Sequence, residues 1–157
     1  MTDGAPGDTP IGHRYGAAAE AEWRLVTSHF ELNEGFALLV LIVPDRDGAA
    51  ICRQALADHL AGSGRTVQDL SPGSPMVLRN LAETLLHGEP DPGAGAVWVA
   101  AAVPASAPDH PAWETAWRWG LATLNQNRNA IVGRYACTLV IVGTPWLVPL
   151  FREAAPD

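Results

Sequence analysis

A pair of aspartates follows the first strongly apolar segment of the chain, at a position where α/β proteins often place their chemistry. The apolar segment covers residues 36–43, and the loop after it contains Asp45, Arg46, Asp47 and Gly48. Ligands of open α/β sheets bind outside the carboxyl ends of the strands, so this loop is the first candidate site. Two carboxylates at this spacing can supply a nucleophile and a general acid or base, or one of them can cap the next helix.

The catalytic alternative has a specific form, because phosphatases of the haloacid dehalogenase type look similar at their first motif. Those enzymes also carry an acidic pair after a later strand, which holds magnesium. Here the last apolar strand is followed by residues 143–146, which read Gly-Thr-Pro-Trp and contain no acid. We therefore prefer the interpretation that Asp47 caps a helix over 48–61, and we retain a small phosphatase-like enzyme using Asp45 and Asp47 as an alternative.

Hydrolysis of ATP or GTP is not expected, because the residues that it needs are missing. A phosphate loop requires glycines, a lysine on the phosphates and a Ser or Thr on magnesium. All ten basic residues of this chain are arginine, and the strand expected over 96–103 delivers no acid for magnesium. No strand is followed by a G-x-G-x-x-G dinucleotide motif either. We expect no catalytic residue and no cofactor.

Composition excludes several other classes of function. The formal net charge of −7, without a run of basic residues, gives no footprint for binding nucleic acid. No apolar run approaches the ~20 residues of a membrane span, and the first residues lack the apolar centre of a signal peptide, so we expect a cytoplasmic protein that binds no membrane. Cys52 and Cys137 lack zinc-ligand spacing and are expected to be reduced, buried thiols.

Apolar runs that alternate with helical patterns predict the elements that position these residues. Strands are expected over 36–43, 66–70, 96–103 and 137–142, and helices over 17–29, 48–61, 76–87 and 109–132, with a last helix from 145. The first and third strands are apolar on both faces, which is typical of strands covered by helices on both sides. Asp109 and Thr144 are expected to cap the last two helices. Residues 1–16 are expected to be a disordered leader.

This alternation predicts an α/β fold. Strands separated by helices favour parallel crossovers, so we expect one three-layer sandwich domain over 17–157 with a mainly parallel four-stranded sheet. On its longest helix, Trp113 and Trp117 continue into an apolar stripe that we expect to be core. Trp119 falls on another face of that helix. Together with Trp146 it is a candidate for a protein interface, because Trp is enriched in binding hot spots.

The C-terminal third of the chain resembles a known family. The residues that carry the resemblance read LNQNRN over 124–129, LVIV over 139–142, PWL over 145–147 and AAPD over 154–157. They are similar to the degenerate NTPase domain of bacterial STAND-like, AAA+-related proteins of conflict and signalling systems, in which a Leu-Asn-x-x-Arg element precedes an apolar strand. The likeness covers about 120 residues. The chain departs from the family at Gly143 and Thr144, where bulkier apolar residues are usual.

The resemblance implies a P-loop-NTPase-like domain without a phosphate loop and with strand order 2-3-4-1. It also implies a regulatory or scaffold role beside an effector or repeat protein, and a domain truncated at its C-terminus, since the family continues beyond the position of Asp157. We therefore expect a non-catalytic protein-interaction module of a bacterial signalling or defence system, with Asn125 and Arg128 as interaction candidates. A small-molecule or nucleotide-binding domain without hydrolysis is an alternative.

Overall fold

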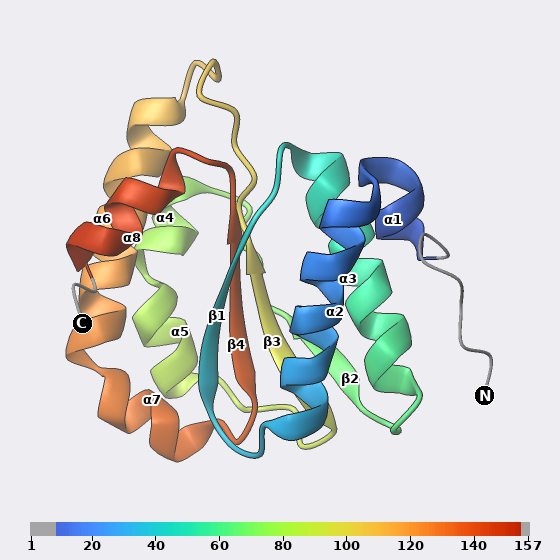
Figure 1. Ribbon diagram of the computed structural model, residues 1–157. Helices are drawn as coiled ribbons and strands as arrows, with labels where there is room; N and C mark the ends of the chain where they lie inside the picture. The colour runs from blue at the N-terminus through green and yellow to red at the C-terminus, as the bar shows by residue number, and fades with distance from the viewer. Residues whose placement is uncertain (1–8, 155–157) are drawn as a thin grey trace.

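The computed structural model describes residues 9–154, which form an α/β fold with one parallel sheet (Figure 1). The strands are β1 (Ala37–Ile42), β2 (Thr66–Asp69), β3 (Ala94–Ala100) and β4 (Thr138–Gly143). Their order across the sheet is β1-β4-β3-β2, which reads 2-3-4-1 from the opposite edge, and all neighbours are parallel. The expected α/β class and parallel four-stranded sheet are confirmed, because each apolar run found in the sequence forms a strand.

Helices cover both faces of the sheet, which gives three layers (Figure 1). On one face lie α1 (Pro10–Tyr15), α2 (Ala17–Leu32) and α3 (Arg46–Ala61), and on the other lie α4 (Pro75–Arg79), α5 (Leu81–His87), α6 (His110–Gln126), α7 (Arg128–Arg134) and α8 (Leu147–Ala154). Alternate side chains of β4 supply the two cores. Val140 and Val142 pack on the side of α1–α3, whereas Leu139 and Ile141 pack on the side of α4–α8.

The first strand differs from its expected burial. Every residue of β4 is buried, and the middle of β3 is buried as expected, but Leu38 and Ile42 of β1 are 43% and 40% exposed. The reason is position in the sheet: β1 lies at an edge, so it has a neighbouring strand on one side only. The expectation of a strand covered on both faces is therefore wrong for β1.

The N-terminal segment also differs from expectation where it is described. Instead of a disordered leader over residues 1–16, residues 10–15 form α1, and Thr9 caps it by accepting a hydrogen bond from the Gly12 N–H at 3.1 Å. The Thr9 hydroxyl donates to Glu20 Oε2 at 2.6 Å, and Ile11 is buried in the core with Trp23. These contacts fix α1 against α2. Residues 1–8 lie outside the described residues.

The helix caps expected at α3 and α8 are wrong in detail. Asp45, not Asp47, caps α3, because its Oδ1 accepts a hydrogen bond from the Gly48 N–H at 2.8 Å. The hydroxyl of Thr144 does not cap α8. It donates instead to the Val103 carbonyl at 2.6 Å, and α8 begins only at Leu147.

Two of the expected helices are each divided by an asparagine. Asn80 separates α4 from α5, and Asn127 separates α6 from α7. The Thr123 carbonyl in the last turn of α6 accepts two hydrogen bonds from Asn127, one from its backbone N–H at 3.1 Å and one from its side-chain amide at 2.8 Å. Asp109 precedes α6 as expected, but its carboxylate accepts a hydrogen bond from the Trp113 indole at 3.0 Å instead of capping the backbone.

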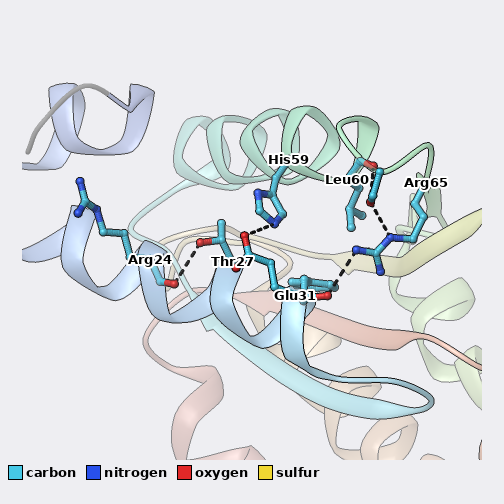
Figure 2. Close-up of polar contacts among 8 residues, drawn as sticks. Arg24, Thr27, Glu31, His59, Leu60 and Arg65 are labelled. Carbon is cyan, nitrogen blue, oxygen red and sulfur yellow. Dashed lines mark hydrogen bonds and ion pairs between the residues drawn. The ribbon is translucent and has the colours of Figure 1, made fainter. Parts of the chain in front are cut away.

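Polar contacts tie α2 to α3 and to the start of β2 (Figure 2). His59 Nε2 of α3 lies 3.8 Å from Glu31 Oε1 of α2. Arg65 donates from Nε to the Ser63 hydroxyl at 2.9 Å and from Nη2 to the Phe30 carbonyl at 3.4 Å. These contacts close the α1–α3 side of the sheet, so the uncovered part of β1 lies on the opposite face.

Candidate functional site

A hollow of about 500 Å³ lies beside β1 on the α4–α8 side of the sheet. Its lining is almost entirely apolar and comes from β1, β4, α6, α7 and α8: Phe36, Ala37, Leu38, Val40, Leu121, Leu124, Asn125, Arg128, Ile131, Val132, Leu139, Phe151 and Ala154. The hollow exists because α6, α7 and α8 cover β3 and β4 but leave the edge strand partly open. Its volume falls within the range of small-molecule and peptide pockets. We call this site the edge hollow.

Two interaction candidates from the sequence meet in the edge hollow. Asn125 is in the last turn of α6 and Arg128 is the first residue of α7, and both side chains are exposed. Arg128 is the one charged residue of the lining. Among residues 9–154 its side chain forms no hydrogen bond or ion pair.

The position of Arg128 between two helices argues against a strong stabilising role. The C-terminal end of α6 favours a cation there and the N-terminal end of α7 opposes one. Arg152 differs, because it lies in the last turn of α8, where a cation is favourable, and is also exposed. A side chain for which the two helix ends oppose each other is a better candidate for contact with a ligand than for support of the fold.

A pair of charge reversals tests this interpretation. We expect Arg152→Glu to lower the thermal stability by about 0.3–1 kcal/mol at low ionic strength and Arg128→Glu to change it by less, because opposed helix ends meet at Arg128 whereas Arg152 lies in the last turn of one helix. Thermal unfolding followed by circular dichroism measures both. A loss of stability in Arg128→Glu well beyond that of Arg152→Glu would mean that Arg128 makes a structural contact.

A second cleft, of about 420 Å³, lies at the carboxyl edge of β2 and β3, where ligands of α/β sheets usually bind. Its polar side chains are mostly engaged with one another. Arg53 Nε lies 2.7 Å from Asp69 Oδ2, and Asp69 Oδ1 accepts a hydrogen bond from the Ser71 N–H at 2.9 Å. The Ser71 hydroxyl accepts from the Ala100 N–H at 3.0 Å. Arg46 is the exposed cation of this cleft.

The Asp45–Gly48 loop is arranged as the start of a helix. Asp45 is used as the cap of α3, and Asp47 is exposed with its Oδ2 3.9 Å from Arg14 Nη2. Gly48 is buried, and a Cβ there would lie 3.0 Å from the Tyr15 hydroxyl and 3.1 Å from the Pro44 ring. In the part of the chain that the structure describes, no group of three or more His, Cys, Asp or Glu side chains could hold a metal ion.

The two tryptophan candidates do not belong to the edge hollow. Trp119 is 52% exposed on α6, where the guanidinium of Arg79 stacks 4.6 Å from its ring centroid. Trp146 is half-buried: its indole donates to the Val103 carbonyl at 2.7 Å and its ring meets His110 edge-on. The sequence named all four residues as interaction candidates without assigning them to one site, and only Asn125 and Arg128 line the edge hollow.

The expected core stripe and the two thiols are found with one difference. Trp113 and Trp117 of α6 are buried, which confirms the stripe. Cys52 and Cys137 are free, but each is half-buried rather than buried. Partial burial raises the pKa of both thiols, which keeps them protonated near neutral pH.

The apolar wall of the edge hollow was not identified as a site from the sequence. Phe36, Leu38 and Val40 belong to a run that is typical of a buried strand, and Val132 and Phe151 are typical of a helix core.

The chain matches no protein-family model, no curated protein and no solved structure. Within residues 9–154, none of the helices combines the length and the apolar character that a membrane span requires.

Proposed function

We propose that this chain is a non-catalytic, NTPase-like module that acts through protein contacts in a bacterial signalling or defence system. The observation that carries the proposal is the edge hollow, an open apolar surface in which Asn125 and Arg128 are the polar residues. Apolar surface of this kind marks binding sites for proteins or ligands. The partner is expected to be an effector or repeat protein of the cytoplasm, and neither nucleic acid nor a membrane.

Two further features support this assignment. The strand order, read as 2-3-4-1, is the order that the resemblance to degenerate NTPase domains implies. The Leu124-Asn125-x-x-Arg128 element, which carries much of that resemblance, lines the hollow. A domain with this fold and without a phosphate loop is expected to act through contacts with other proteins.

The loop after β1 supports a role without hydrolysis. In a working NTPase, backbone N–H groups of this loop surround the phosphates and a lysine reaches them. Here the chain contains no lysine, and the carboxylate of Asp45 already occupies the Gly48 N–H at the start of α3. A phosphate at that position would be repelled by Asp45 and Asp47.

We therefore expect no hydrolysis of ATP or GTP above the buffer background, with or without magnesium. Phosphate release by the purified chain measures this, and Asp45→Asn with Asp47→Asn is the control. Turnover that remains after repeated purification and disappears in that double variant would overturn the proposal and favour the phosphatase-like alternative.

Binding of a partner protein is the positive test. We expect affinity capture from the native host to recover a specific, identified partner, and Val132→Glu to abolish its binding in a purified system. Val132 is 43% exposed in the edge hollow, and the matched control is Val77→Glu, because Val77 is 49% exposed on α4 outside the hollow. Equal binding by the two variants would show that the hollow is not the contact surface.

A small-molecule or nucleotide-binding domain without hydrolysis is the second candidate, and the carboxyl-edge cleft with Arg46 favours it. A ligand that binds only the folded state stabilises it by RT ln(1 + [L]/Kd), so melting curves with ATP, GTP or inorganic phosphate distinguish the candidates. A shift that Arg46→Ala removes would favour the cleft over the edge hollow.

A further inference from the structure

The two edge strands of the sheet, β1 and β2, differ in how readily they can pair with a further strand. The β2 edge is short, carries Gln68 and Asp69, and has an irregular register between Thr66 and Val67. Polar side chains, short length and bulges are the devices by which proteins keep an edge strand from pairing. The β2 edge is therefore protected.

The β1 edge has none of these protections. Its six residues, ALLVLI, are all apolar, its register with β4 is regular, and Leu38 and Ile42 are exposed. A regular, apolar, uncharged edge strand is a template for another strand. An unpaired edge of this kind promotes aggregation. The composition of β1 therefore indicates that its edge is paired with another strand in the functional protein.

The backbone groups available at this edge belong to alternate residues. Val43 donates its N–H to the Gly143 carbonyl of β4 at 2.9 Å, so the odd-numbered residues of β1 face β4. The N–H and C=O groups of Leu38, Val40 and Ile42 consequently point away from the sheet. The side chains of these three residues lie on the α4–α8 face, beside the edge hollow.

We propose that two copies of the chain pair through β1, antiparallel about a twofold axis at Val40, to form one continuous sheet. In this register Leu38 of each copy lies opposite Ile42 of the other, and Val40 lies opposite its own counterpart. Each opposed pair uses outward-facing backbone groups on both strands and exchanges N–H···O=C hydrogen bonds. The inference deepens the proposed function, because it names a second copy as the partner at the β1 side of the same surface.

The register is self-complementary in its side chains as well as in its backbone. Directly opposed residues of antiparallel strands share one face, so Leu38, Val40 and Ile42 of both copies form one apolar patch that joins the two edge hollows. A twofold contact places the same surface on both subunits, and twofold dimers are the commonest symmetric assemblies. A second copy of β1 is therefore a suitable partner for the exposed edge of β1.

Charged side chains flank the paired strands at both ends. Glu34 precedes β1, and Asp45, Arg46 and Asp47 follow it, all of them exposed. Antiparallel pairing carries Glu34 of each copy toward this group of its counterpart, where Arg46 attracts it and the two aspartates repel it. The overall charge of −7 opposes association, and this long-range repulsion is screened by salt.

Light scattering after gel filtration of the full chain tests the proposal. We expect the mass of two chains for the wild type and of one folded chain for the double variant Leu38→Lys with Ile42→Lys, because lysine at an edge strand opposes pairing. The matched control is Leu25→Lys with Met76→Lys, which changes two apolar side chains that are each 74% exposed, on α2 and on α4. Circular dichroism verifies that each variant is folded.

A disulfide assay tests the register. In a hydrogen-bonded antiparallel pair the Cα atoms lie about 5.5 Å apart, within the ~4.4–6.8 Å that a disulfide spans. Val40→Cys should therefore cross-link two chains on oxidation, whereas Leu38→Cys should not, because its counterpart lies four residues away, about 13 Å at ~3.3 Å per residue. The wild type, with Cys52 and Cys137, controls for the native thiols.

The outcomes separate this inference from the proposed function. A wild type that stays a single chain at high concentration overturns the dimer, and a dimer that survives the two lysines or cross-links through Leu38→Cys overturns the β1 register. Either result leaves the proposed function in place if Val132→Glu still abolishes binding of an identified partner. A β1 dimer that recovers no other protein supports this inference alone.

Discussion

Val140→Asp is expected to leave the chain without a stable folded state. Val140 lies in β4, between β1 and β3, and its side chain is fully buried in the core on the α1–α3 side. A carboxylate there has no described cation beside it and no route to water, and burial of an unpaired charge costs several kcal/mol or more. The folded state of an ordinary domain is stable by only about 5–15 kcal/mol.

Val40→Asp is the matched comparison, because it makes the same chemical change on the neighbouring strand. Val40 is half-buried at the rim of the edge hollow, where a carboxylate can remain hydrated in the single chain, although it would oppose the pairing proposed for β1. We expect this variant to fold and to lose less stability than Val140→Asp. Urea titration followed by circular dichroism measures both, at a protein concentration at which light scattering finds single chains. Equal losses would mean that β1 is as closed as β4 and that the edge hollow does not exist in solution.

This comparison also marks the limit of what the sequence could predict about the strands. The runs FALLVLIV and AVWVAAAV both consist entirely of apolar residues, and both were expected to be covered on two faces. Hydrophobic pattern reports that a segment avoids water, but the order of strands across the sheet decides whether a helix is available to cover it. That order depends on contacts between residues far apart in the sequence, and periodicity does not encode them.

Helix ends were predictable only to within a few residues. Asp45 and Asp47 are both good N-cap residues two positions apart, and the choice between them depends on where Pro44 directs the chain. At the N-terminus, Gly and Pro were interpreted as disorder, although Thr9 and Pro10 are a typical helix start and Ile11 has a core to enter. In each case a local signal had two meanings, and packing selected one.

The candidate site was predictable in its polar residues and not in its shape. Asn125 and Arg128 were selected through a motif, and their spacing across a helix end places them together. The concavity beside them results from the edge position of β1, which the described helices of the α4–α8 side leave partly open. Such a space is defined by how the elements are arranged, and no residue type marks it.

Gly120 of α6 is expected to be required by the packing of the α4–α8 side. It lies in the middle of α6, where glycine costs about 1 kcal/mol relative to alanine, so its presence needs a reason. A Cβ at this position would lie 2.9 Å from the backbone carbonyl oxygen of Leu78 in α4. Backbone cannot move aside as a side chain can, and the close approach of α4 and α6 is the reason for the glycine.

We therefore expect Gly120→Ala to destabilise the fold by about 1–3 kcal/mol despite its better helix propensity, and Gly120→Leu by more. Gly133 provides the control, because it is helical in α7 and a Cβ there meets nothing within 4 Å. Gly133→Ala should stabilise by up to about 1 kcal/mol, so the two alanine variants should change the urea midpoint in opposite directions. Changes in the same direction would contradict the close packing of α4 on α6.

A shift of α6 should also change the shape of the edge hollow, because Leu121, Leu124 and Asn125 of this helix line the hollow. In Gly120→Ala, which is expected to remain folded, α6 must move away from α4 or tilt, and the wall formed by these three residues moves with it. Binding of an identified partner to the hollow should weaken in this variant and stay unchanged in Gly133→Ala. A loss of stability in Gly120→Ala with unchanged partner binding would mean that the hollow is not the surface through which the module acts.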